Sequence, residues 1–144
     1  MKESTATWLE EMAFDVEVDG HHFVIDAEEK FGGRDRGPRP KDLVLSALVG
    51  CTGMDVIAIL NKMRVKVDSF SVTAKAKLRD EHPKVFTDIH IIYKFTGENL
   101  PMEKLEKAVN LSQDRYCGVS AMLREVANLT HEIVVEEKVT NAKK

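Results

Sequence analysis

The sequence predicts an α+β fold, in which an antiparallel sheet packs around one long buried central helix in the order β-β-α-β-β-α-α-β. Three observations predict it: apolar residues alternate in several segments, residues 40–63 form an apolar run, and two shorter helical patterns precede a final alternating segment. Strands and helices grouped in this way fit α+β better than repeated βαβ units. The chain has 144 residues, the size of one ordinary domain, and we expect a single domain over residues 1–144.

Composition narrows the class of protein. Hydrophobic residues make up 43% of the chain and charged residues 31%, which is enough apolar material for a folded core. The formal net charge of -3 provides no global positive field, so nucleic acid is not an expected partner. The first residues lack a basic region followed by an apolar core, which predicts a cytoplasmic protein. Residues 43–60 are as long as a short membrane span but contain Ser46, Thr52, Asp55 and two glycines, so we expect no membrane partner.

The first two strands are expected over residues 7–18 and 23–27. Period-two alternation runs through the first segment, and Asp19-Gly20 then reads as a tight hairpin turn, because glycine tolerates positive φ. Residues 31–39 contain three glycines, a proline and three arginines, which predicts a basic loop.

The long helix is expected from Pro40 to about Met63, since proline is tolerated in a first helical turn. It is apolar nearly all the way round, so a sheet and another helix must cover it. Gly50 and Gly53 would let a second backbone approach closely, and a partner subunit is a natural source of that cover.

Alternation returns in residues 70–78 and 85–95, which we expect to form an antiparallel hairpin around a loop at residues 80–83. In the second strand we expect Val85 to share a face with Ile89, and Phe86 to lie on the opposite face. Pro101 opens a helix to Leu111, Gly118 interrupts it before a second helix, and residues 130–137 form the closing strand.

Cys51 and Cys117 are the residues best able to carry chemistry. Two cysteines in a chain of this size cannot make a disulfide framework, so each is either an inert core residue or a redox-active thiol. Cys51 lies near the middle of the long helix, where free cysteine commonly packs as a small hydrophobe. Cys117 precedes Gly118 at the expected start of the last helix, where unpaired backbone N–H groups would lower its thiol pKa.

As a pair, the two thiols suit peroxide reduction. One thiolate attacks a peroxide oxygen and becomes a sulfenic acid, and the second thiol condenses with it to a disulfide. The attacking thiolate needs a nearby cation, a role that suits arginine because it stays protonated. Arg34, Arg36 and Arg39 all lie just upstream of the long helix.

Residues 40–52 (PKDLVLSALVGCT) resemble the motif around the first cysteine of the OsmC/Ohr family, the osmotically induced and organic hydroperoxide resistance proteins. Cys117, within residues 116–120 (YCGVS), matches the second family cysteine. The resemblance implies an OsmC-like fold in an intertwined homodimer, with two interface sites that each hold Cys51 and Cys117 with an arginine and an acid. It also implies thiol-dependent reduction of organic or inorganic hydroperoxides in oxidative stress defence, with an external dithiol as reductant and no cofactor.

One position departs from the family pattern. In the best-characterised hydroperoxidase branches a glutamate directly follows the proline, whereas this chain has Lys41 there and its acid, Asp42, one position later. One residue along a helix is a rotation of about 100°, so Asp42 does not simply replace an acid at position 41. We expect Arg39 to serve as the arginine and Asp42 as the acid of the site. The sequence is closer to the less-characterised OsmC-like branch than to either named enzyme.

Asp55 lies four residues after Cys51 and therefore on about the same helix face. An unpaired carboxylate there would raise the thiol pKa and suppress attack. We therefore expect Asp55 to hydrogen-bond away from the sulfur, and the alternative is that it holds an arginine beside Cys51.

We expect no metal, because no histidine has a ligand spacing that pairs with the cysteines. The histidines are His21, His22, His82, His90 and His131.

Two other functions are alternatives to the enzyme hypothesis. A non-catalytic OsmC-like protein would bind an apolar small ligand at the dimer interface, and the Lys41 departure is its main support. A purely structural dimer would have no pocket at the cysteines. A Cys51–Cys117 disulfide formed with cumene or tert-butyl hydroperoxide would favour the enzyme, and unreactive thiols would favour the binding protein.

Overall fold

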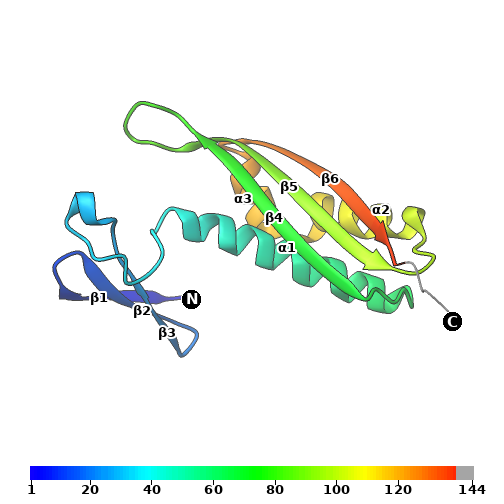
Figure 1. Ribbon diagram of the computed structural model, residues 1–144, viewed down its shortest axis with the longest axis horizontal. Helices are drawn as coiled ribbons and strands as arrows, with labels where there is room; N and C mark the ends of the chain where they lie inside the picture. The colour runs from blue at the N-terminus through cyan, green and yellow to red at the C-terminus, as the bar shows by residue number, and fades with distance from the viewer. Residues whose placement is uncertain (139–144) are drawn as a thin grey trace, which may run out of the picture. The chain divides into compact units, whose positions relative to one another are not determined.

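The computed structural model describes residues 1–138, and its α+β architecture follows the expected element order with one additional strand (Figure 1). The chain divides into two compact units, Met1–Leu45 and the part from Ser46 onward. The strands and helices are β1 (Ser4–Glu10), β2 (Ala13–Val18), β3 (His21–Ile25), α1 (Asp42–Lys62), β4 (Ser69–Leu78), β5 (Phe86–Gly97), α2 (Met102–Leu111), α3 (Gly118–Arg124) and β6 (Asn128–Glu137).

The first unit is a three-stranded antiparallel sheet in the order β1-β2-β3. The single strand predicted over residues 7–18 is wrong, because the chain reverses after Glu10 and Glu11 adopts a φ of 51°. Trp8 and Phe14 are cross-strand partners, so the alternation of apolar residues continues across the turn and hides it. The Asp19-Gly20 turn is confirmed, with φ values of 51° and 78°, the positive pair that favoured hairpin turns require.

The loop that follows β3 is organised around one buried carboxylate. Asp26 is 2% exposed and accepts hydrogen bonds from the backbone N–H groups of Ala27, Arg34 and Arg36, at 2.7, 3.1 and 3.1 Å. The Arg36 Nε donates to the same carboxylate at 2.7 Å. This hydrogen bond from Arg36, followed by those from the backbone, holds the pKa of Asp26 far below its usual range despite burial. The basic loop is thus fixed by a charge that it encloses.

We expect Asp26→Asn to lower the melting temperature, because an amide does not replace the ion pair with Arg36. A carboxylate whose pKa is lowered by folding stabilises the protein above its unfolded pKa of about 3.9, and this contribution is lost as the pH falls. The difference in Tm between the wild-type protein and the variant should therefore be largest near pH 7 and should become smaller at acidic pH. Thermal unfolding across this pH range measures it, with Asp19→Asn in the exposed turn as the control. A Tm difference that does not depend on pH would contradict this account.

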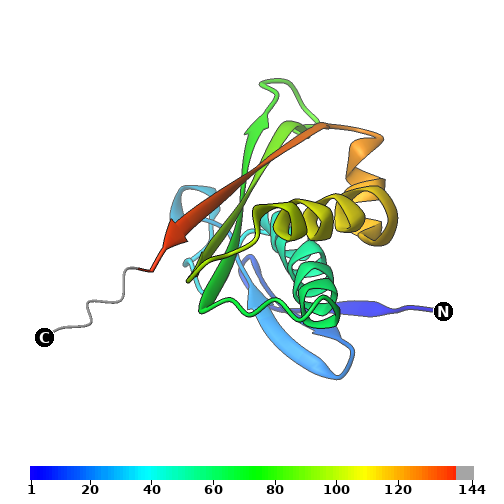
Figure 2. The ribbon, with the colours of Figure 1, turned by 90° about the vertical axis from the view of Figure 1, so that its right-hand side faces the viewer.

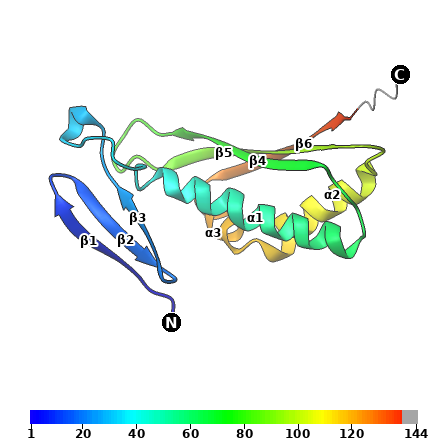
Figure 3. The same cartoon turned by 60° about the horizontal axis from the view of Figure 1, so that its bottom comes forward.

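The second unit has a three-stranded sheet in the order β4-β5-β6. β4 and β5 form the expected antiparallel hairpin, whereas β6 pairs with β5 in parallel, so the sheet is mixed. The parallel pairing requires a crossover connection, which α2 and α3 supply. Figures 2 and 3 show that the helices of this unit lie on one face of the sheet.

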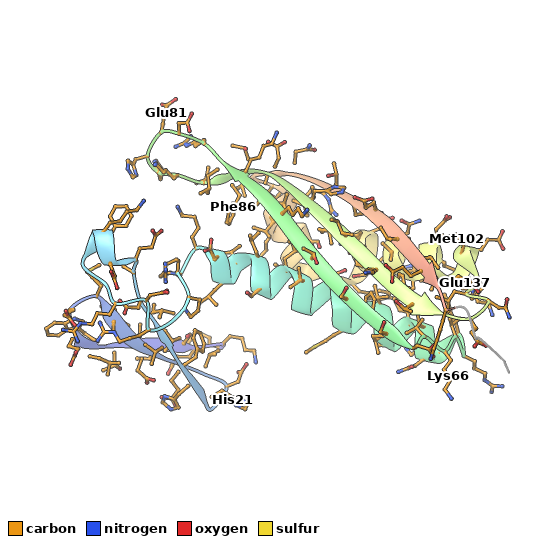
Figure 4. The ribbon with its side chains drawn as sticks, in the orientation of Figure 1. His21, Lys66, Glu81, Phe86, Met102 and Glu137 are labelled. Atoms are coloured by element: carbon orange, nitrogen blue, oxygen red, sulfur yellow. The ribbon has the colours of Figure 1, made fainter. Side chains whose placement is uncertain are left out.

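The core of the second unit lies between β5 and the helices. The apolar side chains on one face of β5 are fully buried, namely Ile89, Ile91, Tyr93 and Phe95. The predicted facing is wrong at the start of this strand, where Phe86 is 9% exposed and Val85 is 42% exposed. A register shift between Lys77 and Leu78 places Phe86 opposite Leu78 and reverses the alternation there. Glu81 lies at the tip of the β4–β5 connection (Figure 4).

Helix α1 buries one stripe within the chain, formed at four-residue spacing by Leu48, Thr52, Val56 and Leu60. Its Met54 is 78% exposed. Within the described residues α1 is therefore packed against the rest of the chain on one side, whereas we expected it to be covered on most sides. No neighbour lies within 4 Å of a Cβ built at Gly50 among the described residues. By length and apolar composition α1 would pass for a membrane span, and 22% of its most apolar 18-residue window is buried.

Candidate functional site

The structure brings the two cysteines together. Cys51 lies in α1 and Cys117 lies directly before α3, yet their sulfur atoms and a carboxylate oxygen of Asp55 are all within 4.8 Å of one another. Both thiols are free. Cys117 is 3% exposed, whereas Cys51 is half-buried, so Cys51 is the more accessible of the pair.

Cys117 caps the N-terminus of α3, as its place before Gly118 predicts. Its sulfur accepts a hydrogen bond from the backbone N–H of Ser120 at 3.3 Å. The predicted lowering of the Cys117 pKa is nevertheless wrong, because burial raises it and the hydrogen bond from Ser120 only partly offsets that effect. Cys51 also acts to raise the Cys117 pKa. Cys117 is thus a thiol that resists ionisation while both cysteines are reduced.

A buried hydrogen-bond network lies beside the thiols and joins α1, β5 and the segment after α2. The Thr52 hydroxyl is 2.7 Å from the Tyr93 hydroxyl and 2.7 Å from the Ser112 hydroxyl. Ser112 also donates to Asp55 at 3.0 Å, and the Gln113 side-chain amide donates to the Tyr93 hydroxyl at 2.7 Å. Burial raises the pKa of Tyr93, which keeps it a neutral donor. The network therefore reaches the carboxylate that faces the sulfurs.

A π-helical segment, Ser112–Tyr116, connects α2 to Cys117. Its wider turn is closed by the Cys117 N–H, which donates to the Ser112 carbonyl at 2.8 Å. Both Ser112 and Gln113 are buried within this segment, and Arg124 of α3 donates to the Gln113 carbonyl and side-chain oxygens, each at 3.2 Å. The segment turns these polar side chains inward and holds the start of α3 near α1.

Sequence reasoning missed four members of the network, Thr52, Tyr93, Ser112 and Gln113. Only Tyr93 carried a signal, because it is a hydroxyl-bearing residue on the apolar face of an alternating strand, where a buried O–H requires a partner. No pattern in the local sequence predicts the π-helical turn, and the positions of Ser112 and Gln113 depend on that turn.

The position of Asp55 differs from the one predicted. It was expected to hydrogen-bond away from the sulfur of Cys51, but its carboxylate lies within 4.8 Å of both sulfurs while it accepts from Ser112. The four-residue spacing from Cys51 did predict the shared helix face correctly.

The other predicted site residues, Arg39 and Asp42, lie in the first unit, whereas the cysteines lie in the second. Asp42 is the first residue of α1. Each candidate arginine is 2.7 to 3.1 Å from an acid of its own unit. The pairs are Arg34 with Glu11, Arg36 with Asp26, and Arg39 with Asp35. The roles of Arg39 and Asp42 toward the thiols stay predictions.

Comparison with known proteins identifies the family. The model of the OsmC-like protein family matches residues 32–132, which is more than half of the chain. The chain belongs to the OsmC-like protein family. The resemblance seen in the cysteine motifs and the OsmC-like fold are both confirmed.

Several known proteins align with nearly the whole chain. Protein YhfA of Escherichia coli is 35% identical over 129 residues, which are 89% of this chain and 93% of that protein. A hypothetical protein from Aquifex aeolicus is 30% identical, with a TM-score of 0.85 over 96% of this chain and 98% of that one. The organic hydroperoxide resistance protein OhrB of Bacillus subtilis shares the fold at 17% identity, with a TM-score of 0.65 over 92% and 97% of the two chains.

Tyr93→Phe should destabilise this OsmC-like protein by about 1–3 kcal/mol, because Gln113 and Thr52 would lose a buried partner. Urea denaturation measures the change as a lower midpoint at an unchanged slope. Tyr116→Phe removes the same hydroxyl from a side chain that is 58% exposed and should have almost no effect. Equal midpoints for the two variants would show that the network does not contribute to stability.

Proposed function

We propose that this OsmC-like protein is a thiol-dependent peroxidase that reduces organic or inorganic hydroperoxides with Cys51 and Cys117. The observation that carries the proposal is the pair of free sulfurs within 4.8 Å of each other, supplied by separate elements. A disulfide has an S–S length of about 2.05 Å, so closing the pair requires the sulfurs to approach by less than about 3 Å. A chain that used its cysteines only for packing would have no need of this proximity.

The chemistry balances with one external reductant. The Cys51 thiol gives up its proton, and the thiolate attacks the outer peroxide oxygen, so that the O–O bond breaks and Cys51 becomes a sulfenic acid. The leaving oxygen takes up one proton and departs as an alcohol, or as water from an inorganic peroxide. Cys117 condenses with the sulfenic acid, which forms the S–S bond and releases water. An external dithiol reduces the disulfide by thiol–disulfide exchange and is itself oxidised to a disulfide. Neither a metal nor an organic cofactor enters these steps.

The two cysteines differ in a way that supports separate roles. Cys51 is half-buried and can meet a peroxide, which favours it as the attacking thiolate. Cys117 is 3% exposed, and burial raises its pKa, which keeps it protonated and unreactive until a sulfenic acid forms next to it. The arrangement supports Cys51 as peroxidatic and Cys117 as resolving cysteine.

The family resemblance implies an arginine and an acid at the site, and we assign the cation that stabilises the Cys51 thiolate to Arg39 and the orientation of that arginine to Asp42. Arg39 is bound at 2.7 Å to Asp35, an exposed acid, so its guanidinium is not committed to a buried partner. Arg36, by contrast, is held by the buried Asp26 and has a structural task. This difference supports Arg39 over Arg36.

We further propose that the protein acts as a cytoplasmic homodimer. Met54 is 78% exposed and Ile57 37% exposed on α1, next to a groove of about 520 Å³ between α1 and β4. A second copy covering this face would remove apolar surface from water. Sedimentation of the intact chain measures the oligomeric state, and a monomer at micromolar concentration would reject this part of the proposal.

Cys51→Ser is expected to abolish consumption of cumene or tert-butyl hydroperoxide, because no thiolate remains to attack. Cys117→Ser should consume one equivalent and then stall or over-oxidise, because the sulfenic acid has no partner. Peroxide consumption with a dithiol reductant, together with mass spectrometry of the cysteines, separates the two results. The double variant provides the blank. Undiminished multiple turnover in both single variants would remove the two-thiol mechanism, and thiols unreactive toward peroxide would favour the ligand-binding alternative.

Arg39→Gln should lower kcat/KM for the peroxide by about 10²- to 10³-fold, the cost of losing one charge-stabilising donor. Asp42→Asn should lower it less, because it removes only the orientation of the arginine. Arg34→Gln, which removes an arginine bound to the exposed acid Glu11, is the matched control and should retain activity. Full activity in Arg39→Gln together with loss in Arg34→Gln would transfer the role to Arg34.

A further inference from the structure

Cys51, Cys117 and Asp55 form a cluster of three potential metal ligands in the second unit. One ligand atom from each residue, two sulfurs and one carboxylate oxygen, lies within 4.8 Å of the other two. Two of the three residues, Cys51 and Asp55, are one helical turn apart on α1, and Cys117 approaches them from the start of α3. A rigid helix therefore presents a pair of ligands, and a helix cap supplies the third.

The distances suit a tetrahedral zinc ion. Zinc binds thiolate sulfur at about 2.3 Å and carboxylate oxygen at about 2.0–2.2 Å, which places neighbouring ligand atoms about 3.5–3.8 Å apart. Contraction from at most 4.8 Å to that spacing needs shifts of about 1 Å, within the reach of side-chain rotation. Three protein ligands leave the fourth position for water.

The charges of the cluster also call for a cation. The Asp55 carboxylate oxygen lies within 4.8 Å of both sulfurs. Its hydrogen bond from Ser112 is neutral and does not compensate the carboxylate charge. A divalent ion that touches both sulfurs and the carboxylate would supply that compensation. The Asp55 carboxylate thus serves as the third ligand.

The groups around the three residues are placed as outer partners of metal ligands. Ser112 donates to Asp55 at 3.0 Å and fixes the carboxylate, and the Ser120 N–H donates to the Cys117 sulfur at 3.3 Å. The buried Ser120 hydroxyl has no hydrogen-bond partner among residues 1–138. Such outer hydrogen bonds orient ligands and tune metal affinity.

We propose that reduced Cys51, Cys117 and Asp55 bind one zinc ion per chain. The expectation of no metal rested on the spacing of the histidines, and this site needs none of them. The proposal concerns binding and does not require peroxidase activity. Thiolate ligands favour zinc over magnesium or calcium, which prefer oxygen ligands.

The test uses the reduced, intact protein without an affinity tag, titrated with zinc against a competing chromophoric chelator. The wild-type protein should bind one equivalent, and Asp55→Asn, which keeps the shape of the side chain, should bind at least about tenfold more weakly. Asp80→Asn, in the exposed β4–β5 loop, is the matched control and should bind as the wild type does. Cobalt as a spectroscopic probe should give a sulfur-to-metal charge-transfer band that Cys51→Ser and Cys117→Ser each weaken.

A second measurement on the unmutated protein avoids any folding defect of the variants. Zinc should slow alkylation of the cysteines by iodoacetamide, whereas magnesium at the same concentration should not. Unchanged alkylation, or equal zinc affinity in the wild type and Asp55→Asn, would overturn the proposal. Zinc binding without peroxide turnover would reject the proposed peroxidase alone, and peroxide turnover without zinc binding to the reduced protein would reject the metal site alone.

Discussion

The buried contact of Thr52 with Tyr93 and Ser112 is the constraint on which the site depends. Thr52 follows Cys51 and precedes Asp55 on α1, so its two 2.7 Å hydrogen bonds fix the helix face that carries both groups. A hydroxyl buried in an apolar core costs free energy unless it is paired, and these side chains pair with one another across α1, β5 and the segment after α2. The network therefore specifies a geometry as well as contributing stability.

The π-helical segment carries this constraint to the second cysteine. One added residue per turn rotates the end of α2, so that Ser112 faces α1 and the chain leaves toward Cys117. The cost of the poorer helical geometry is offset where Gln113 bonds to Tyr93 and Arg124 bonds to Gln113. Insertions of this kind occur frequently at functional sites, and here the insertion determines where a thiol lies.

The fold could be predicted from sequence where one periodicity governs a whole segment. The alternation of β5 identified the buried face at Ile89 and beyond, and the apolar run defined α1 to within two residues at its start. Prediction failed at Phe86, where a register shift reverses the alternation, and between Trp8 and Phe14, where a turn preserves it. The period of apolar residues alone does not reveal a bulge or a chain reversal, because both depend on pairing with another strand.

The site could be predicted only as far as local signals reach. The two cysteine motifs and the four-residue spacing of Asp55 were visible, because helical spacing is a local property. The direction of the Cys117 pKa shift was not visible in the sequence. The helix end that lowers this pKa is a local feature, whereas the burial that raises it depends on tertiary packing. The direction of a thiol pKa thus depends on packing that no single segment determines.

The redox and metal-binding chemistries proposed for this site draw on the same sulfur lone pairs. A lone pair given to a zinc ion is not available to attack peroxide, and a disulfide has lost the thiolates that a zinc site requires. Asp55 has a role only in the metal-bound state, where its carboxylate oxygen is a ligand of the cation. Zinc would therefore act as a reversible block on the reduced pair, and the availability of metal would decide how much of the dithiol can meet a hydroperoxide.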